Sequence, residues 1–307
     1  MRCSSLKKRS TEFNLPTQAV VLVAIAWAIV SLLFFLLFSV SPSDEGRPYW
    51  YQIATYVLEN GAFLGAAVLC LRNWRSPQIV SGRSVWLALG LGMVSFFIAN
   101  LFLGYWELIL QQEPDVSPGD FFFILMYVFV GAGMFLAVLS RRLSLSIGQW
   151  LTVVAIGLAG SGAVYYLYAA PSEPEAEAAA TEAAPAADAV VSPAWATAID
   201  QQLAPLADLF ALLYVIGDIL LVILATMLLM AFWGGRFSQS WRFIAAAAFC
   251  FYIADLWFSW AIRYIPNYET GALPEVFWIF SGVLFAIGAA LEYDLSTRSR
   301  RSSRRRA

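Results

Sequence analysis

The chain has 307 residues, of which 60% are hydrophobic and 13% charged, and its formal net charge is -2. A soluble domain is about 45–50% apolar and about 25% charged, so this composition excludes an ordinary water-soluble protein. The sequence contains no histidine, which excludes histidine-ligated haem, zinc sites that need histidine, a phospho-accepting histidine and every Ser/His or Cys/His catalytic arrangement.

Eight segments are apolar enough to cross a bilayer, whose hydrocarbon core is about 30 Å thick and needs roughly 20 helical residues. In chain order they are 17–40, 49–72, 84–106, 119–140, 147–170, 206–233, 241–263 and 273–292. The first segment lacks the short apolar region and the A-x-A-like site of a cleaved signal peptide, so we expect it to remain as a helix. The sequence therefore predicts an all-α, polytopic integral membrane protein with eight transmembrane helices.

Basic residues are concentrated in alternate connections between these segments. All of the 19 Lys and Arg residues except Arg47 and Arg263 lie in five parts of the chain. These are the N-terminus (1–16), the connections after the second, fourth and sixth segments with their flanks, and the tail (294–307). Cytoplasmic connections are enriched in Lys and Arg. The pattern therefore predicts cytoplasmic N- and C-termini, in a cell membrane of the inner or another energy-transducing type.

The fifth connection differs from the others in length and composition. Residues 171 to about 204 are mostly alanine, proline and acidic residues. Such a segment has too few apolar side chains to bury, so we expect a disordered extracytoplasmic linker here.

The two halves of the chain resemble each other. With a shift of 155 residues, FFIANLF at 96–102 overlays FYIADLW at 251–257, and Asp120 meets Glu275. With a shift of 158, Tyr56 and Asn60 meet Tyr214 and Asp218. We therefore predict a duplication, with one four-helix unit at 17–143 and a second at 144–293. Four helices per unit is an even number, so the two units are expected to be parallel.

Polar residues inside the predicted spans are the candidates for a function. A charge at the bilayer centre costs roughly 2.5–3.5 kcal/mol even on the mildest scale, and such residues usually face the interior of the bundle. Asn60 and Asp218 are expected roughly 15 Å below the outer surface, and Asn100 and Asp255 roughly 9–12 Å below it. Asp120 and Glu275 stand at the outer entrances of their helices, so all of these residues can reach one outward-facing polar zone. The candidate ligand-binding residues are Asn60, Asn100, Asp120, Tyr214, Asp218, Asp255 and Glu275.

Spacing and charge refine this expectation. Tyr214 and Asp218, like Tyr56 and Asn60, are four residues apart on one helix face, where a hydroxyl can donate to its neighbour or to a ligand. No basic residue inside the membrane offsets Asp218 and Asp255. We expect such carboxyl groups to be protonated or bound to a cation, because desolvation disfavours the charged form.

Structural explanations exist for several of these candidates. Asp120 and Glu275 begin helices, where acidic residues are favoured by the free N–H groups and the helix dipole. Asn60 and Asn100 can act as hydrogen-bonding links between helices. The three cysteines contain no C-x-x-C pair, and the sequence has no G-x-x-x-x-G-K-[ST] loop. We therefore predict no catalytic residue, metal site or cofactor, and we do not expect an enzyme.

Three short motifs carry a resemblance to a known group of proteins. They are YVIGD at 214–218, IADLW at 253–257 and PEVFW at 274–278. The pattern resembles the multi-pass sensory regions found ahead of GGDEF and EAL domains or histidine kinases in bacteria. No such output domain follows in this sequence. The resemblance therefore implies the membrane module alone, with a membrane or cytoplasmic partner protein carrying the output.

Three functions are consistent with these features. The first is a non-enzymatic sensory or regulatory module that binds a small ligand or partner in the outer half of the bundle. The second is a scaffold or assembly factor for another membrane complex. The third is a small proton- or cation-coupled transporter, which is disfavoured because the second and sixth segments have no proline break. The bilayer is the expected environment, and no nucleic-acid partner is expected.

Topology gives the first test. A reporter fused after Arg142 or Ala307 is expected to be cytoplasmic, and one inserted near Ala187 is expected to be extracytoplasmic, because an odd number of spans separates Ala187 from either site. Reporter activity in whole cells measures the side of each fusion. If Ala187 and Ala307 report the same side, the prediction of eight spans is wrong.

Overall fold

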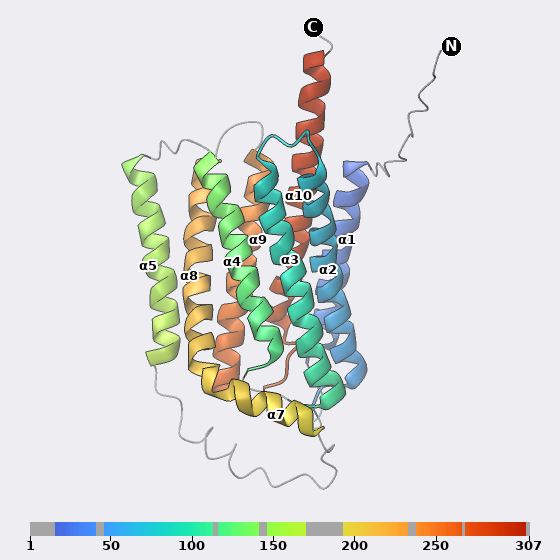
Figure 1. The fold of residues 1–307 in the computed structure, drawn as a ribbon, viewed down its shortest axis with the longest axis vertical. Helices are drawn as coiled ribbons and strands as arrows, with labels where there is room; N and C mark the ends of the chain where they lie inside the picture. Colours follow the sequence, from blue (N-terminus) through green and yellow to red (C-terminus); the bar gives the residue numbers. More distant parts are fainter. Residues whose placement is uncertain are drawn as a thin grey trace, which may run out of the picture.

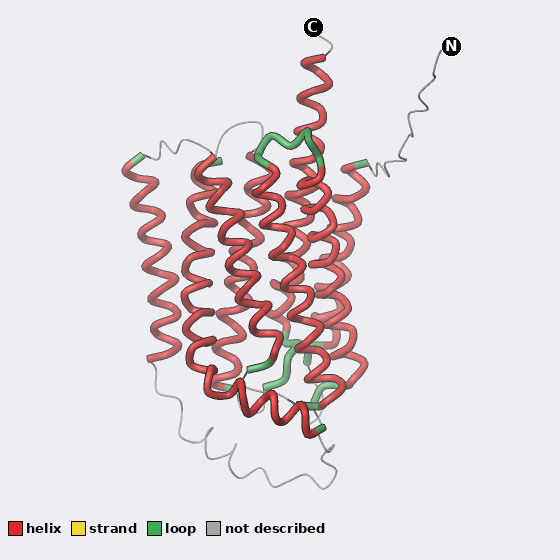
Figure 2. Tube along the Cα trace, viewed as in Figure 1, coloured by secondary structure: helices red, strands yellow, loops and turns green. Residues whose placement is uncertain are grey.

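The computed structural model describes residues 16–40, 46–112, 116–140, 146–169, 193–232, 238–265 and 268–304 (Figure 1). Within these ranges the chain is helical, with short turns and no strand (Figure 2). Eight helices are long and apolar enough to cross a membrane. The prediction of an all-α, multi-pass membrane protein is confirmed.

The membrane-crossing helices begin and end close to the predicted residues. They are α1 (Thr17–Phe38), α2 (Tyr49–Arg75), α3 (Arg83–Gly104), α4 (Pro118–Ser140), α5 (Ile147–Ala169), α8 (Ala207–Ala231), α9 (Ser238–Tyr264) and α10 (Val276–Arg304). Helix α3 continues as a π-helical segment, η1 (Tyr105–Leu110), which ends at Gln111 with φ 52°. A 3-10 turn, η3 (Leu273–Glu275), leads into α10.

Six helices form a closed ring. Following the contacts around it, the order is α2, α3, α4, α8, α9, α10 and back to α2. Helix α1 packs outside the ring on α10, and α5 packs outside it on α8 (Figure 1). The start of α1 and the end of α10 lie at one end of the bundle, and helix α7 (Ala194–Leu203) lies across the other. We call these the termini end and the α7 end.

Aromatic side chains fill the centre of the ring. Phe63 stacks on Phe96 with ring centroids 3.6 Å apart, and the ring of Phe96 lies 5.8 Å from that of Phe251. Closer to the termini end, Trp86 and Trp241 also lie 5.8 Å apart. Phe96 and Phe251, like Trp86 and Trp241, are separated by 155 residues in the sequence. Residues at matching positions of the two predicted units therefore meet in the core of the bundle.

Two glycine contacts follow the same offset. A Cβ atom at Gly133 would lie 2.9 Å from the side chain of Leu89, and one at Gly288 would lie 2.7 Å from that of Ile244. In both places the absence of a side chain at the glycine lets the neighbouring helix approach closely. The parallel duplication itself stays a prediction.

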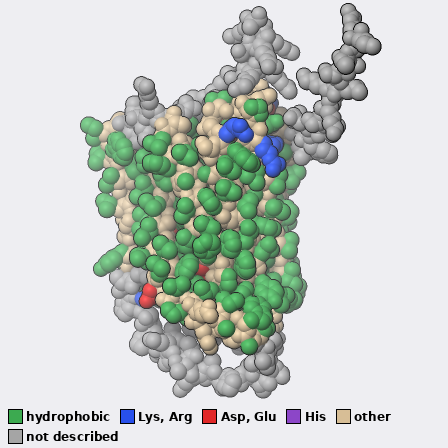
Figure 3. All heavy atoms as spheres, viewed as in Figure 1, with side chains coloured by type: hydrophobic (Ala, Val, Ile, Leu, Met, Phe, Trp, Pro, Cys, Tyr) green, Lys and Arg blue, Asp and Glu red, His purple; other side chains and the backbone are tan. Residues whose placement is uncertain are grey.

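The outer surface of the bundle suits a bilayer. Large apolar side chains point outward along its length, for example Leu22, which is 66% exposed, and Leu158, which is 69% exposed (Figure 3). Described arginines gather at the termini end, among them Arg72, Arg75 and Arg83 at the α2–α3 connection. This is the charge segregation that the sequence predicts, and the cytoplasmic assignment of the termini end stays a prediction.

The linker prediction is wrong for the residues that form α7. Residues 170–192 lie outside the described part of the chain, but Ala194–Leu203 is a helix followed by the turn Ala204–Leu206. Ala196 is fully buried and packs with Trp106 of η1. The indole Nε1 of Trp106 donates to Asp200 Oδ1 over 3.0 Å. Helix α7 is amphipathic, which is difficult to recognise in an alanine-rich sequence. Its apolar face is buried because Trp106 lies beside it.

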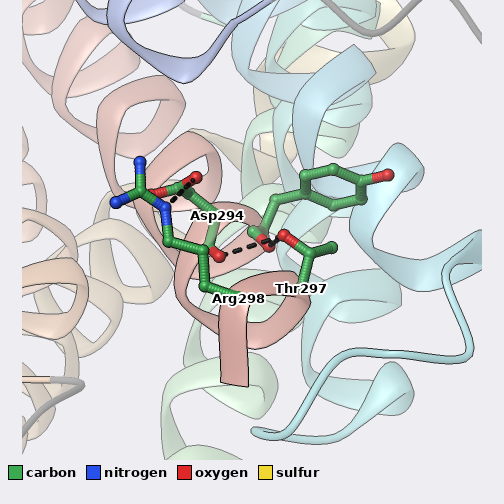
Figure 4. A network of polar contacts seen from close by, with 4 residues as sticks. Asp294, Thr297 and Arg298 are labelled. Carbon is green, nitrogen blue, oxygen red and sulfur yellow. Dashed lines mark hydrogen bonds and ion pairs between the residues drawn. The ribbon is translucent and has the colours of Figure 1, made fainter. Parts of the chain in front are cut away.

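The predicted Arg-rich tail begins as a continuation of α10. This helix runs to Arg304, so it extends beyond the other helices at the termini end (Figure 1). Arg298 pairs with Asp294 one turn earlier, with an N–O distance of 2.9 Å (Figure 4). The hydroxyl of Thr297 donates to the carbonyl oxygen of Tyr293 over 2.9 Å. These local contacts favour helix beyond the apolar span.

Helix packing predicts a difference between two glycines of α4. In Gly133→Ala the new methyl group would press on Leu89, and such overpacking costs about 1–3 kcal/mol. Gly131 is the matched control, because a Cβ there would lie 3.9 Å from its nearest neighbour, Leu224. We therefore expect Gly131→Ala to be neutral or stabilising by up to about 1 kcal/mol. Thermal unfolding in detergent compares the two, and equal melting temperatures would contradict the close α3–α4 contact.

Candidate functional site

Two of the predicted acids meet at one tyrosine inside the bundle. The hydroxyl of Tyr127 on α4 lies 2.7 Å from Asp218 Oδ1 on α8, and it also contacts Asp255 Oδ2 on α9. The indole Nε1 of Trp278 on α10 donates to Asp255 Oδ1 over 2.5 Å. We call Tyr127, Asp218 and Asp255 the triad. With Trp278, it connects four consecutive helices of the ring.

The triad lies deep in the bundle. Tyr127, Asp218 and Asp255 are nine to eleven residues from the α7 ends of their helices, or about 14–16 Å at 1.5 Å per residue. Tyr127 is 7% exposed and Asp218 is 6% exposed. At this depth the bilayer supplies no water to these groups, so they depend on one another for hydrogen bonds.

Local sequence explains how a tyrosine ring fits between α4 and α8. Gly217 precedes Asp218, and a Cβ atom at Gly217 would lie 2.5 Å from the ring of Tyr127. The ring of Phe251 lies 5.7 Å away on the other side. The missing side chain at Gly217 thus makes room for the ring, and Phe251 holds it in place.

Asp120 joins α4 to α8 nearer the α7 end. Its Oδ1 accepts a hydrogen bond from the hydroxyl of Tyr214 over 2.6 Å. Its Oδ2 accepts from the backbone N–H of Ser117 over 2.7 Å, as expected for a residue that caps a helix start. The Tyr214 hydroxyl therefore does not donate to Asp218, which is one of the two uses that the spacing allows. Helical side chains lean toward the N-terminus of their helix, which for α8 is the α7 end, so the Tyr214 hydroxyl points away from Asp218.

A second group of acids lies on the other side of the ring. Glu59 on α2 accepts a hydrogen bond from Asn100 Nδ2 on α3 over 3.1 Å. Glu107 on η1 accepts from the hydroxyl of Tyr56 over 2.7 Å and from that of Thr270 over 2.9 Å. Glu59 is close enough to Glu107, Glu275 and Asp255 to interact with their charges. The acidic groups of both halves therefore share one electrostatic environment.

Glu275 closes this environment at the start of α10. The side chain is 5% exposed and accepts hydrogen bonds from the backbone N–H of Gly271, over 2.6 Å, and from the hydroxyl of Tyr268. Burial and the adjacent Glu275 carboxyl raise the pKa of Tyr268, so its hydroxyl stays a donor. Gly271 has φ +105°, and a Cβ there would lie 2.8 Å from the ring of Tyr51. Only glycine fits this turn.

The structure brings six of the seven predicted site residues into this polar zone. They are Asn100, Asp120, Tyr214, Asp218, Asp255 and Glu275. Asn60 stays apart, because its Nδ2 donates to the backbone carbonyl of Tyr56 over 2.9 Å and its Oδ1 is buried without a hydrogen-bond partner in the described structure. The Tyr56 hydroxyl donates to Glu107 and not to Asn60.

Tyr127, Trp278 and Glu107 are site residues that were not predicted from the sequence. Tyr127 carries the one hydroxyl between Asp120 and Ser140 in an otherwise apolar stretch. A buried tyrosine hydroxyl usually finds a hydrogen-bond partner, so this residue had a detectable signal. Trp278 is part of the PEVFW motif, but a hydrogen bond from its indole was not predicted. Glu107 follows the predicted end of its span, and the extension of α3 by η1 brings it into the polar zone.

The chemistry of this zone is that of oxygen and indole groups. Among the described residues, no group of three or more acidic or cysteine side chains is placed to hold a metal ion. An apolar groove of about 370 Å³ lies between α5 and α9 on the outer surface, lined by Ala163, Tyr166, Ile253, Leu256, Trp257 and Trp260. The acids, phenols and indole of the zone can hold, donate or exchange protons, or bind a ligand that carries hydrogen-bond donors.

Comparisons of the chain with protein-family models, with curated proteins and with solved structures find no match. The resemblance to sensory membrane regions stays a prediction. The function proposed below therefore rests on the contacts of the polar zone.

Removal of the central hydroxyl gives a direct test of the triad. In Tyr127→Phe both carboxyl groups lose their shared partner, and an unsatisfied buried group costs about 1–3 kcal/mol. Tyr165→Phe is the control, because Tyr165 is 74% exposed and surface changes usually stay within about 0.5 kcal/mol. Melting temperatures in one detergent compare the variants. Equal stability of the two would show that the triad contacts do not contribute to the fold.

Proposed function

We propose that this chain is a non-enzymatic sensory or regulatory membrane module. It binds a small ligand or partner in the half of the bundle nearest α7 and transmits the resulting change to the termini end. The observation that carries this proposal is the triad with Trp278, in which single polar groups on α4, α8, α9 and α10 depend on one another. A change in any one of these groups alters the contacts of four helices together.

Helix α10 provides a path between the two ends. Trp278 lies in its first turn, and the helix continues to Arg304, about 39 Å further on at 1.5 Å per residue. A helix transmits a rotation or shift of its first turn along its length, because its backbone hydrogen bonds keep it rigid. A displacement of Trp278 therefore moves the part of α10 that extends beyond the bundle (Figure 1).

The extended end of α10 is the proposed output surface. Together with the preceding residues of the helix, it carries Arg298, Arg300, Arg301 and Arg304. We propose that this end is cytoplasmic, where it contacts a partner protein and the anionic lipid surface. The half nearest α7 then faces outward, as the sensory regions named above would require.

Scaffolding is the second candidate. Each carboxyl group of the polar zone has a hydrogen-bonding partner in another part of the bundle, which is also what a protein needs to hold its own helices together. The two functions differ in one requirement. A scaffold needs only hydrogen bonds of the right shape, whereas a ligand-binding module needs the carboxyl groups themselves.

Asp218→Asn and Asp255→Asn separate these candidates. Both changes keep size and hydrogen-bonding capacity but remove the ionisable group, so we expect at least one variant to lose function while it still folds. The effect should be larger at Asp218, which is the more deeply buried. Asp208→Asn is the matched control, because Asp208 is an exposed acid in the first turn of the same helix.

Complementation of a strain that lacks the gene measures function, and melting temperature in detergent measures folding. We expect Asp208→Asn to complement fully and Asp218→Asn to fail although its melting temperature is at least that of the unmodified protein. Full complementation by both folded Asp218 and Asp255 variants would contradict ligand binding and favour the scaffold.

A further inference from the structure

Donors and acceptors do not balance in the triad. The carboxyl groups of Asp218 and Asp255 present four oxygen atoms, and Tyr127 contacts one from each group. A phenol has a single proton, so it can donate to only one of them. If both acids were ionised, the second contact would bring two oxygen lone pairs together without a proton between them.

Neighbouring phenols do not supply the missing proton. The hydroxyl of Tyr214, one turn from Asp218 on α8, donates to Asp120. The hydroxyl of Tyr252, one turn from Asp255 on α9, donates to the carbonyl oxygen of Gly160 on α5 over 3.1 Å. Both tyrosines lie on the helices that carry the acids of the triad, and both use their proton elsewhere.

Charged groups around the triad do not offset it either. Glu59 on α2 is close enough to interact with the charge of Asp255 and with that of Glu275 at the start of α10. These neighbours are acids, so they supply no positive charge. Arg47, at the α7 end, donates to the carbonyl oxygens of Glu269 and Thr270. Arg263 is eight residues from Asp255 along α9, or about 12 Å.

These contacts assign the proton to a particular residue. Asp255 accepts from Trp278 Nε1 on one oxygen, and a donation from Tyr127 to its other oxygen satisfies both. Asp218 then meets a phenol oxygen whose proton is already used, and a protonated Asp218 carboxyl can donate to that oxygen. We infer that Asp218 binds one exchangeable proton, and that this proton is the small ligand of the module. This inference rests on the proposed function.

Loss of the proton changes the helix contacts. The proton passes from Asp218 Oδ1 to a water molecule or buffer base, and two carboxylates then face each other across α8 and α9. Their repulsion is strong, because little water is present to screen it. Tyr127 stays bound to Asp255, so Asp218 separates from Tyr127 and α8 moves relative to α4 and α9. Through Trp278 the same change reaches α10.

The bound proton can be observed by infrared spectroscopy of the full chain in lipid nanodiscs. A protonated carboxyl group gives a C=O stretching band that shifts in D2O, and a carboxylate does not. We expect this band at neutral pH, with a component that disappears in Asp218→Asn and persists in Asp208→Asn. Identical bands in the unmodified protein and Asp218→Asn would overturn the assignment.

Tyr127→Phe tests the position of the proton in case Asp218→Asn does not fold. Removal of the phenol oxygen weakens the hydrogen bond from Asp218, so the Asp218 component should move to higher frequency. Tyr165→Phe serves as its control and should leave the band in place. An unchanged band in a folded Tyr127→Phe protein would show that the protonated group is not bonded to Tyr127.

Stability provides a second readout with a definite sign. A proton that is bound in the folded state and released on unfolding stabilises at low pH, and its contribution is lost as pH rises. We expect the melting temperature of the unmodified protein to fall through this transition and that of Asp218→Asn to lack the same step. A step of equal size in both proteins would overturn the inference.

The infrared experiment and the complementation experiment can contradict the two proposals independently of each other. If the Asp218 band is lost in Asp218→Asn but that variant complements, Asp218 binds a proton and the proposed sensory function is wrong. If Asp218→Asn fails to complement and the band is absent from the unmodified protein, the module stands and its ligand is not a proton.

Discussion

In a bilayer, a buried polar group must find its hydrogen-bond partner within the protein, because lipid chains offer none. This constraint determines how the ring of helices is joined. Asp218 has a partner only because Tyr127 reaches it from α4, and Asp255 has two because Trp278 reaches it from α10. The apolar core sets the distances between helices. The triad restricts their positions further, because a displaced oxygen atom has no alternative partner. The polar contacts therefore specify the positions of the helices near α7. These positions depend on the hydrogen bonds within the triad.

The two halves of the ring satisfy this constraint in different ways. At the positions that correspond to Asp218 and Asp255, the first half carries Asn60 and Asn100. An amide is neutral, and Asn60 Nδ2 donates to a carbonyl group of its own helix, while its Oδ1 has no hydrogen-bond partner in the described structure. The residue 155 positions after Tyr127 is Gly282, which packs against Ala62 of α2. The α10–α2 contact at Gly282 is thus closed by small residues, and the α4–α8–α9 contacts are closed by a phenol and two acids. The first half still contributes an acid, Glu59 on α2, which bonds to the amide of Asn100.

Most of the fold could be predicted from sequence because hydropathy reports a solvent requirement. Segments such as 119–140 must lie in lipid whatever their neighbours are, so their number was correct. Most of their limits were close, but η1 extends α3 and the helix of the last span continues to Arg304. Contacts between side chains were harder to predict. Tyr214 and Asp218 share a helix face, but the direction of the tyrosine ring sends its hydroxyl to Asp120. Helix α7 depends on Trp106, a residue far away in sequence, and composition alone indicated disorder. Tyr127 has no charged or amide group to mark it, and its importance follows from which helices become neighbours in the ring.

The π-helical segment η1 extends this dependence to the surface at the α7 end. Trp106 and Glu107 are adjacent in sequence, yet the first bonds to Asp200 of α7 and the second to Tyr56 and Thr270. Successive side chains of a helix point in different directions, so this one turn contacts both α7 and the polar zone. π-helical turns often occur at functional sites, where they redirect side chains within an otherwise regular helix. A movement of α7 therefore acts on Glu107, whose carboxyl group shares its electrostatic environment with Glu59, and Glu59 in turn interacts with Asp255. The triad is thus connected to the surface at the α7 end through η1 and to the termini end through α10, and these two connections are what a module that relays a signal across a membrane requires.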